Sequence, residues 1–159
     1  GKKESTAEHS WRLALFTGII SQEFPELDGK KLLMMALVHD LGEIYDGDIS
    51  AALLPDPDEK YKSEAGSVSR LLSLLEEPAR SRIASLWQEY EDGRTAEAKL
   101  VKALDKAETI IQHSQGRNPA GFDYGFNLEY GKEYFEQDER LEALRSLIDA
   151  ETRTRMEIK

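Results

Sequence analysis

The most apolar run of the chain, Leu32–Val38 (LLMMALV), is followed at once by one histidine and four carboxylates, in residues 39–48 (HDLGEIYDGD). A run of this kind belongs in a core, so its end places His39 and the acids next to buried structure. Burial of unpaired carboxylates is costly, because like charges packed closely need a cation or water around them. The segment therefore predicts either a cation site or a solvated turn.

Helical patterns account for most of the chain, and strand patterns are weak throughout. Ser5 and Glu8 form a capping box that opens a first helix. Its apolar stripe consists of Leu13, Phe16, Ile19 and Ile20. Further helices are expected over residues 28–42, 62–77, 78–93 and 95–116, with a proline-broken acidic loop at 53–61. These patterns predict an all-α protein.

The domain organisation follows from the length. A chain of 159 residues is most simply one domain, large enough to bury a core. We expect a motif-bearing core over about residues 4–113, an irregular aromatic loop over 114–132 and a charged C-terminal helix over 133–159.

The charge and the lack of cysteine restrict the partners. The formal net charge is −10, so the protein repels polyanions, and we expect no nucleic acid polymer as a partner. Without cysteine there is no disulfide, zinc-thiolate site or cysteine nucleophile. No basic-then-apolar leader is present, and no apolar run approaches about 20 residues, so we expect a cytoplasmic protein that does not bind membranes.

Four side chains form a candidate ligand set: His9, His39, Asp40 and Asp105, the last of which interrupts an apolar helix face. Taken singly, such a histidine or aspartate is more often a satisfied or solvated side chain. Together, two imidazoles and two carboxylates from three helices suit one divalent transition ion, and they favour Mn, Co, Fe, Ni or Zn over Mg. Calcium would prefer an all-oxygen shell. Such a set leaves coordination positions open for water and substrate.

Three motifs in order resemble the HD-domain phosphohydrolases, whose pattern is a His, then a His-Asp pair, then a distant Asp. More narrowly, they are similar to the 5′-deoxynucleotidase branch. The resemblance covers roughly residues 4–112. It is carried by ESTAEHSWRLAL (4–15), ALVHDLGEIYDGDIS (36–50) and AKLVKALDKAETIIQ (98–112).

The resemblance implies a compact multi-helix bundle with a metal site in a central cleft. It implies that His9, His39, Asp40 and Asp105 are the metal ligands and that Glu43 and Asp48 are the reacting acids. The implied activity is a metal-dependent phosphomonoesterase that converts a 5′-deoxynucleoside monophosphate to nucleoside and phosphate. Alternatives are another phosphate substrate (a nucleoside triphosphate, a cyclic nucleotide or a non-nucleotide), a regulatory module without catalysis, and a helical interaction protein with solvated acids.

Other residues depart from the branch pattern or allow two interpretations. The segment that helps to select deoxyribose in this branch lies upstream of the first histidine, and only eight residues precede His9 here. Trp11 is no substitute, and we expect it in the core. Lys106, Lys60 or Lys62 could meet a phosphate, although exposed lysines are the simpler interpretation.

The aromatic loop and the chain end raise the question of a dimer. Phe122, Tyr124 and Phe126 could stack on a base, but a core or dimer contact is the simpler interpretation. His113 is either a helix-end residue or part of the pocket wall. The branch commonly forms homodimers. In this chain the aromatic loop and the C-terminal helix are the candidate surfaces, and either could equally pack internally.

Overall fold

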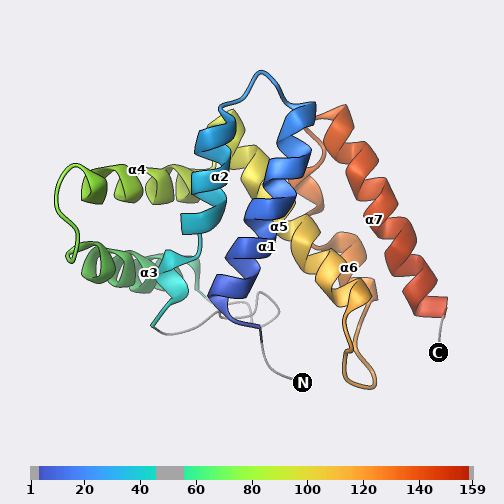
Figure 1. The fold of residues 1–159 in the computed structure, drawn as a ribbon. Coiled ribbons are helices and arrows are strands. Elements are labelled where there is room, and N and C mark those ends of the chain that lie inside the picture. The colour runs from blue at the N-terminus through green and yellow to red at the C-terminus, as the bar shows by residue number, and fades with distance from the viewer. Residues whose placement is uncertain (1–3, 46–55, 158–159) are drawn as a thin grey trace.

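The computed structural model describes residues 4–45 and 56–157, and every regular element within these ranges is helical, which confirms the all-α class (Figure 1). The 3-10 turns are η1 (Ser21–Glu23), η2 (Leu41–Glu43) and η4 (Lys132–Tyr134). The α-helices are α1 (Thr6–Ile20), α2 (Gly29–Val38), α3 (Pro57–Leu72), α4 (Ala79–Asp92), α5 (Ala96–Gln115), α6 (Gly125–Glu129) and α7 (Glu139–Glu157).

Helix α5 is the central element of the bundle. It packs against α1, α2, α4 and α7, and Figure 1 shows it between the α3–α4 pair and α7. Its apolar residues Val101, Leu104 and Ile110 are fully buried, and each buried side chain of this size stabilises the fold by about 1.5–3 kcal/mol. Asp105 and Glu108 are buried on the same helix. The core therefore encloses two carboxylates, which need partners of opposite charge.

Side-chain caps start the helices that lead into the core. The predicted capping box is present, since Glu8 N donates to Ser5 Oγ and the Glu8 carboxylate accepts from Ser5 N. Asp28 caps α2 and Thr95 caps α5 in the same manner. Each cap satisfies backbone donors that the first helical turn leaves free, so these starts are determined locally.

The exposed face of α1 corrects one expectation. Trp11 is 63% exposed, so its predicted place in the core is wrong, and Ile19 of the predicted stripe is 58% exposed. Leu13 of the predicted stripe is buried together with Thr17, and Phe16 and Ile20 pack against the core as expected. Because 3.6 residues make one turn, Trp11 and Ile19 lie on the opposite side of α1 from Leu13.

Helix α3 corrects a second expectation. It begins at Pro57 and ends at Leu72, whereas the sequence suggested a loop through residue 61 and a helix over 62–77. The Asp56 carboxylate accepts hydrogen bonds from the two backbone amides that follow Pro57. A proline after such a cap starts a helix instead of breaking one, because its missing N–H is not needed there.

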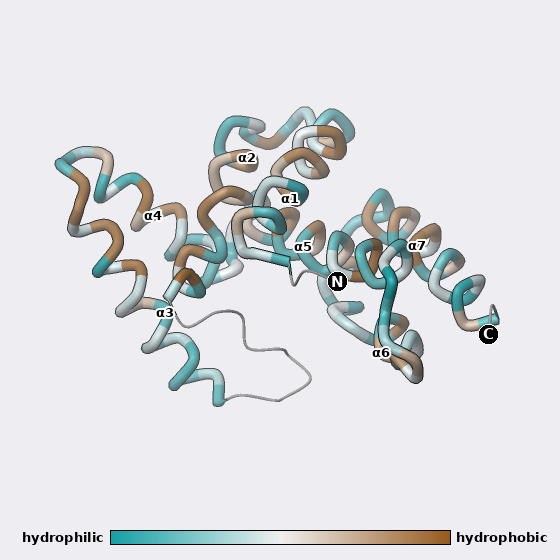
Figure 2. The backbone as a smooth tube through the Cα atoms, turned by 60° about the horizontal axis from the view of Figure 1, so that its bottom comes forward, coloured by the Kyte–Doolittle hydropathy of each residue, from teal (hydrophilic) through white to brown (hydrophobic). Residues whose placement is uncertain are grey.

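The remaining boundaries differ by less. Pro78 is the N-cap of α4 and does not lie in its first turn. The loop expected over 114–132 contains the short helix α6, and α7 begins at Glu139. Figure 2 shows apolar and hydrophilic residues alternating along the helices. Among the described helices, none combines the length and the apolar content that crossing a bilayer requires.

Candidate metal centre

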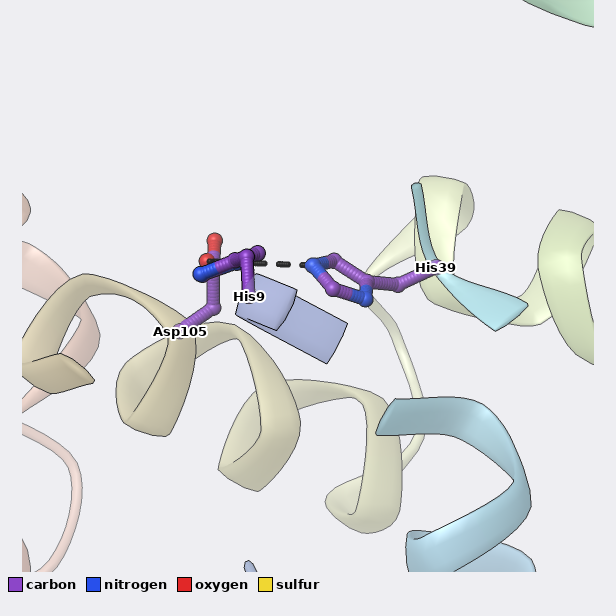
Figure 3. Close-up of side chains that lie close together, drawn as sticks. All are labelled: His9, His39 and Asp105. Carbon is purple, nitrogen blue, oxygen red and sulfur yellow. Dashed lines mark hydrogen bonds and ion pairs between the residues drawn. The ribbon is translucent and has the colours of Figure 1, made fainter. Parts of the chain in front are cut away.

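Four predicted ligands converge between three helices. His9 lies in the first turn of α1, His39 caps the C-terminus of α2 and is followed by Asp40, and Asp105 is in the middle of α5. Figure 3 shows His9, His39 and Asp105 grouped together. Nε2 of His9 lies 3.1 Å from Asp105 Oδ1 and 3.6 Å from Asp40 Oδ2. Nε2 of His39 lies 3.1 Å from Asp40 Oδ1 and 3.8 Å from Asp105 Oδ1.

The apolar run of α2 sets the position of His39. Met35 and Ala36 are fully buried, and His39 follows them on the same face of the helix. Its Nδ1 lies 2.9 Å from the carbonyl oxygen of Ala36, so Nδ1–H donates and Nε2 is left as the free lone pair. That Nε2 atom is buried, and although Asp40 Oδ1 lies 3.1 Å away, it forms no hydrogen bond of suitable geometry with any described residue. A buried nitrogen that receives no hydrogen bond can bind a metal ion through its lone pair. The surroundings of His39 therefore fit a metal ion.

A buried carboxylate orients His9 in the same way. Nδ1 of His9 lies 2.8 Å from Oε2 of Glu108, which is only 3% exposed. Arg12 forms an ion pair with the other Glu108 oxygen at 2.6 Å and a second one with Glu4 at 2.9 Å. Histidine ligands in metal sites characteristically donate their second N–H to a carboxylate or a carbonyl, and both arrangements occur here.

The second oxygen of Asp105 has partners of its own. Oδ2 accepts from Lys106 Nζ at 2.8 Å and from the Tyr90 hydroxyl at 3.2 Å. Lys106 is thus half-buried and not exposed, and its ammonium forms an ion pair with Asp105. Gly131 makes room for this lysine, because a Cβ there would lie 2.5 Å from Lys106 Cγ, and its φ of +62° also favours glycine. The other oxygen, Oδ1, is left to face both histidines.

The carboxylates determine the protonation of this cluster. Burial opposes the imidazolium form, but hydrogen bonds to Asp105 and Glu108 outweigh it and raise the pKa of His9 to about 11. Burial also opposes the charged form of His39, but the charge and hydrogen bond of Asp40 and the charge of Asp105 together raise its pKa. Burial favours protonated Asp105, yet Lys106 and the histidines hold its pKa well below the usual range. The cluster thus attracts positive charge, and with its donor set it indicates a divalent metal ion.

Of the two predicted reacting acids, Glu43 lies within the described residues and Asp48 does not. Asp48 lies outside the described residues, as does Asp46. Glu43 ends the turn η2, where its backbone N donates to Asp40 O at 3.0 Å. Its Oε1 accepts from Lys60 Nζ at 3.2 Å. Glu43 is thus one turn beyond a ligand and bound to a lysine of α3.

Gly42 allows this close approach of η2 to α3. A Cβ on Gly42 would lie only 2.5 Å from the Cβ of Glu64, so any side chain there would push the two elements apart. Lys60 also forms an ion pair with Glu64, so it links α3 to the turn that carries Glu43. Lys62 is exposed on the same helix, as the simpler interpretation had it.

His113 and the aromatic loop lie apart from the ligand cluster. Nδ1 of His113 lies 2.8 Å from the Asn127 side-chain oxygen, and its ring packs edge-on against Phe122. Phe122 in turn packs against Tyr124, whereas Phe126 is 39% exposed. His113 lines a pocket of about 770 Å³ together with residues of α1 that include Trp11 and Arg12. Because Phe122 packs against the rings of both His113 and Tyr124, its contacts are internal to the protein.

Three residues around the ligands were not among the predicted site residues. Glu108 lies one helical turn after Asp105, and Arg12 lies one turn after His9, so helical spacing carries a signal for both. Tyr90 has no such signal, because it comes from α4 and meets Asp105 only through the packing of α4 on α5.

Comparisons with known proteins show which family the chain resembles. Residues 1–145 match the family model described as HD domain. A human protein named 5′-deoxynucleotidase HDDC2 is 36% identical over 114 residues, which are 72% of this chain and 55% of the relative. The protein of the same name from Dictyostelium discoideum is 38% identical over 69% of this chain and 60% of its own length. The chain thus spans somewhat more than half the length of these curated relatives.

Solved structures have the same fold. A protein described as a predicted metal-dependent phosphohydrolase from Magnetospirillum magnetotacticum superposes with a TM-score of 0.76 at 28% identity, covering 96% of this chain and 82% of that one. The PH0347 protein from Pyrococcus horikoshii gives a TM-score of 0.71 at 26% identity, over 96% and 85% of the two chains. The family match, the shared fold and the converging histidine–aspartate cluster lead to one conclusion: this chain belongs to the HD-domain family.

Proposed function

We propose that the protein is a metal-dependent phosphomonoesterase that hydrolyses 5′-deoxynucleoside monophosphates to nucleoside and phosphate. The observation that carries the proposal is the convergence of the two Nε2 atoms of His9 and His39 on oxygens of Asp40 and Asp105. The curated relatives named 5′-deoxynucleotidase support the choice of substrate, since they are 33–38% identical to this chain.

The ligands in this proposal are His9, His39, Asp40 and Asp105, and Mn, Co, Fe, Ni or Zn suits their mixed nitrogen and oxygen donors better than Mg. A divalent ion, when bound, supplies a Lewis acid that polarises a phosphoryl oxygen and lowers the pKa of water. Glu108 and the Ala36 carbonyl hold the histidine rings with Nε2 inward. The two histidine side chains are therefore already ordered before an ion binds.

Glu43 and Asp48 are the acids that move protons in this proposal. Water attacks phosphorus as the bond from phosphorus to the sugar oxygen breaks. One carboxylate accepts the proton of that water, and the other acid donates a proton to the departing sugar oxygen. The ion pair with Lys60 keeps the Glu43 side chain in place beside Asp40.

A phosphate-release assay against a substrate panel tests the proposal. The panel contains deoxy- and ribonucleoside 5′-monophosphates, a nucleoside triphosphate, a cyclic nucleotide and a sugar phosphate, each with added Mn, Co or Mg and with chelator. We expect phosphate from the 5′-deoxynucleoside monophosphates with Mn or Co and none with chelator. Hydrolysis of another member alone would select a different phosphohydrolase. Inactivity on the whole panel with metal bound would indicate a regulatory module and would remove the proposal.

We also propose that the protein is cytoplasmic, which the lack of cysteine supports, and that it forms a homodimer. Five large apolar residues are exposed on α1 and α2: Trp11, Leu15, Ile19, Leu33 and Leu37. Gly18 of α1 lies against Leu33 of α2, so the two helices present one surface. Exposed apolar patches of this kind are typical of interfaces.

Light scattering on the wild type and on Leu15→Glu tests the homodimer. The wild type should have twice the monomer mass, and the variant should have the monomer mass. A monomeric wild type would contradict the proposal.

A further inference from the structure

Lys102 lies at the wall of the ligand cluster. It is on α5, three residues before Asp105 and one turn before Lys106. Its Nζ lies over the ring of Tyr90, 4.0 Å from the ring centre. The hydroxyl of that tyrosine donates to Asp105 at 3.2 Å, and its ring packs edge-on against His39. A single side chain therefore separates the ammonium of Lys102 from two of the ligands.

The charge of Lys102 is not neutralised by a direct partner. Lys60 pairs with Glu43 and Glu64, and Lys106 pairs with Asp105. Lys102, in contrast, forms no hydrogen bond or ion pair with any residue in the described ranges. Burial lowers its pKa, and the charge of Glu91 opposes this, although the two do not come within ion-pair distance. A half-buried ammonium without a hydrogen-bond acceptor binds an incoming anion more strongly than a hydrated one.

The end of α4 holds this lysine in place. Gly93 terminates α4 with φ of +60°, and its N–H donates to the carbonyls of Glu89 and Tyr90. A Cβ on Gly93 would lie 3.1 Å from Cε of Lys102, so the aliphatic stem passes directly over the glycine. The same turn thus positions both Tyr90 and the stem of Lys102.

The cluster needs such a cation for electrostatic reasons. A phosphate monoester that reaches this site approaches Asp40, Asp105 and Glu43, all of which repel it. Lys60 and Lys106 form ion pairs with Glu43 and Asp105, so their charges offset these carboxylates and leave little for an incoming phosphate. Among Lys60, Lys102 and Lys106, Lys102 is the one that forms no ion pair within the described structure, and its ammonium contacts the Tyr90 ring instead.

We propose that Lys102 is a phosphate-binding residue of this site, which contacts phosphoryl oxygens of the substrate and of the released phosphate. The inference rests on the proposed function in so far as a phosphate ester has to bind beside the ligands. It names the residue that provides the attraction for the anion, separate from the ligands and from the acids that move protons. No covalent step is assigned to Lys102.

Inorganic phosphate is the probe that tests the proposal. Its binding to the metal-loaded protein is titrated by calorimetry for the wild type, Lys102→Met and Lys102→Arg. The matched control is Lys99→Met, an exposed lysine one turn earlier on α5. We expect Lys102→Met to weaken phosphate binding by about 10–100-fold, the effect of losing a charged hydrogen bond. Lys102→Arg should restore part of the binding, and Lys99→Met should match the wild type.

Further readouts separate binding from structure. Lys102→Met should raise KM for the nucleotide more than it lowers kcat, and should leave the affinity for Mn²⁺ and the unfolding midpoint near wild type. Unchanged phosphate affinity in Lys102→Met, or no phosphate binding by the metal-loaded wild type, would overturn the inference. A wild type that binds phosphate but hydrolyses no panel member would remove the proposed function instead, while a weakened Lys102→Met would still support the phosphate contact.

Discussion

Oε2 of Glu108 lies 2.8 Å from Nδ1 of His9, and this buried carboxylate directs the opposite ring nitrogen toward Asp105. When a metal ion displaces the Nε2 proton, this contact leaves the ring in the tautomer that has its lone pair on Nε2. Arg12 forms an ion pair with the other Glu108 oxygen at 2.6 Å, so both oxygens of this buried carboxylate have partners. One turn of α5 thus supplies the proposed ligand Asp105 and the residue that orients the proposed ligand His9.

The first prediction follows from this pair. Glu108→Gln keeps the shape of the side chain, but its amide can donate to Nδ1 and so favour the wrong tautomer. We expect the affinity for Mn²⁺ or Co²⁺ to fall by about 10–100-fold, as for other residues that orient metal ligands. Calorimetric titration measures it, with the exposed Glu151→Gln on α7 as control. Equal affinities in both variants would show that Glu108 serves the fold alone.

The second prediction concerns His39, whose Nε2 is buried without a hydrogen-bond partner among the described residues. His39→Gln removes a nitrogen ligand while the side chain still fills part of the space beside Ala36. We expect elemental analysis to find little bound transition metal at neutral pH, and hydrolysis to fall with it. The far-ultraviolet circular dichroism should remain helical. Retained metal at the wild-type level would mean that the cluster is held for stability and not for a cation.

The proposed ligands stand out in the sequence because they carry local signals. The Ser5–Glu8 box places His9, the apolar run before it places His39, and Asp105 stands out on an apolar face. The all-α class follows from the same periodicity. Helical caps and apolar spacing are short-range features, so a single sequence contains them.

What the sequence does not predict depends on tertiary packing. Helix α1 has apolar residues on two faces, so the face that α2 and α5 cover cannot be told from that helix alone, and Trp11 was placed wrongly. Tyr90 meets Asp105 only because α4 packs across α5. At Asp56–Pro57 the same residue types can end one segment or start another, and the Asp56 cap decides for a start.

The third prediction is that chelator makes stability depend on pH through His9. In the cation-free cluster, burial opposes the charge, but Asp105 and Glu108 raise the pKa of His9 from 6.5 to about 11. A pKa raised by folding stabilises fully below about pH 6.5, and this contribution is lost as the pH rises toward 11. We expect the urea midpoint of metal-free protein to fall between about pH 7 and pH 10.

Two variants check that this slope belongs to the cluster. His9→Gln should flatten the fall, and His113→Gln, which changes a histidine outside the cluster, should keep it. Metal-loaded protein should show a smaller fall, because the ion replaces protons as the positive charge beside the carboxylates. A metal-free wild type of constant stability over this range would contradict the raised pKa.

The fourth prediction separates Glu43 from its neighbour Glu64, because both carboxylates pair with Lys60. If Glu43 takes part in proton transfer, Glu43→Gln should lower kcat by about 10²–10⁴-fold, the usual contribution of a general acid or base. Metal content should stay the same, since Glu43 is not a ligand. Glu64→Gln removes the other partner of Lys60 and should leave kcat within a few-fold of wild type. Equal losses in both variants would assign the effect to the charge around Lys60 and not to a proton held by Glu43.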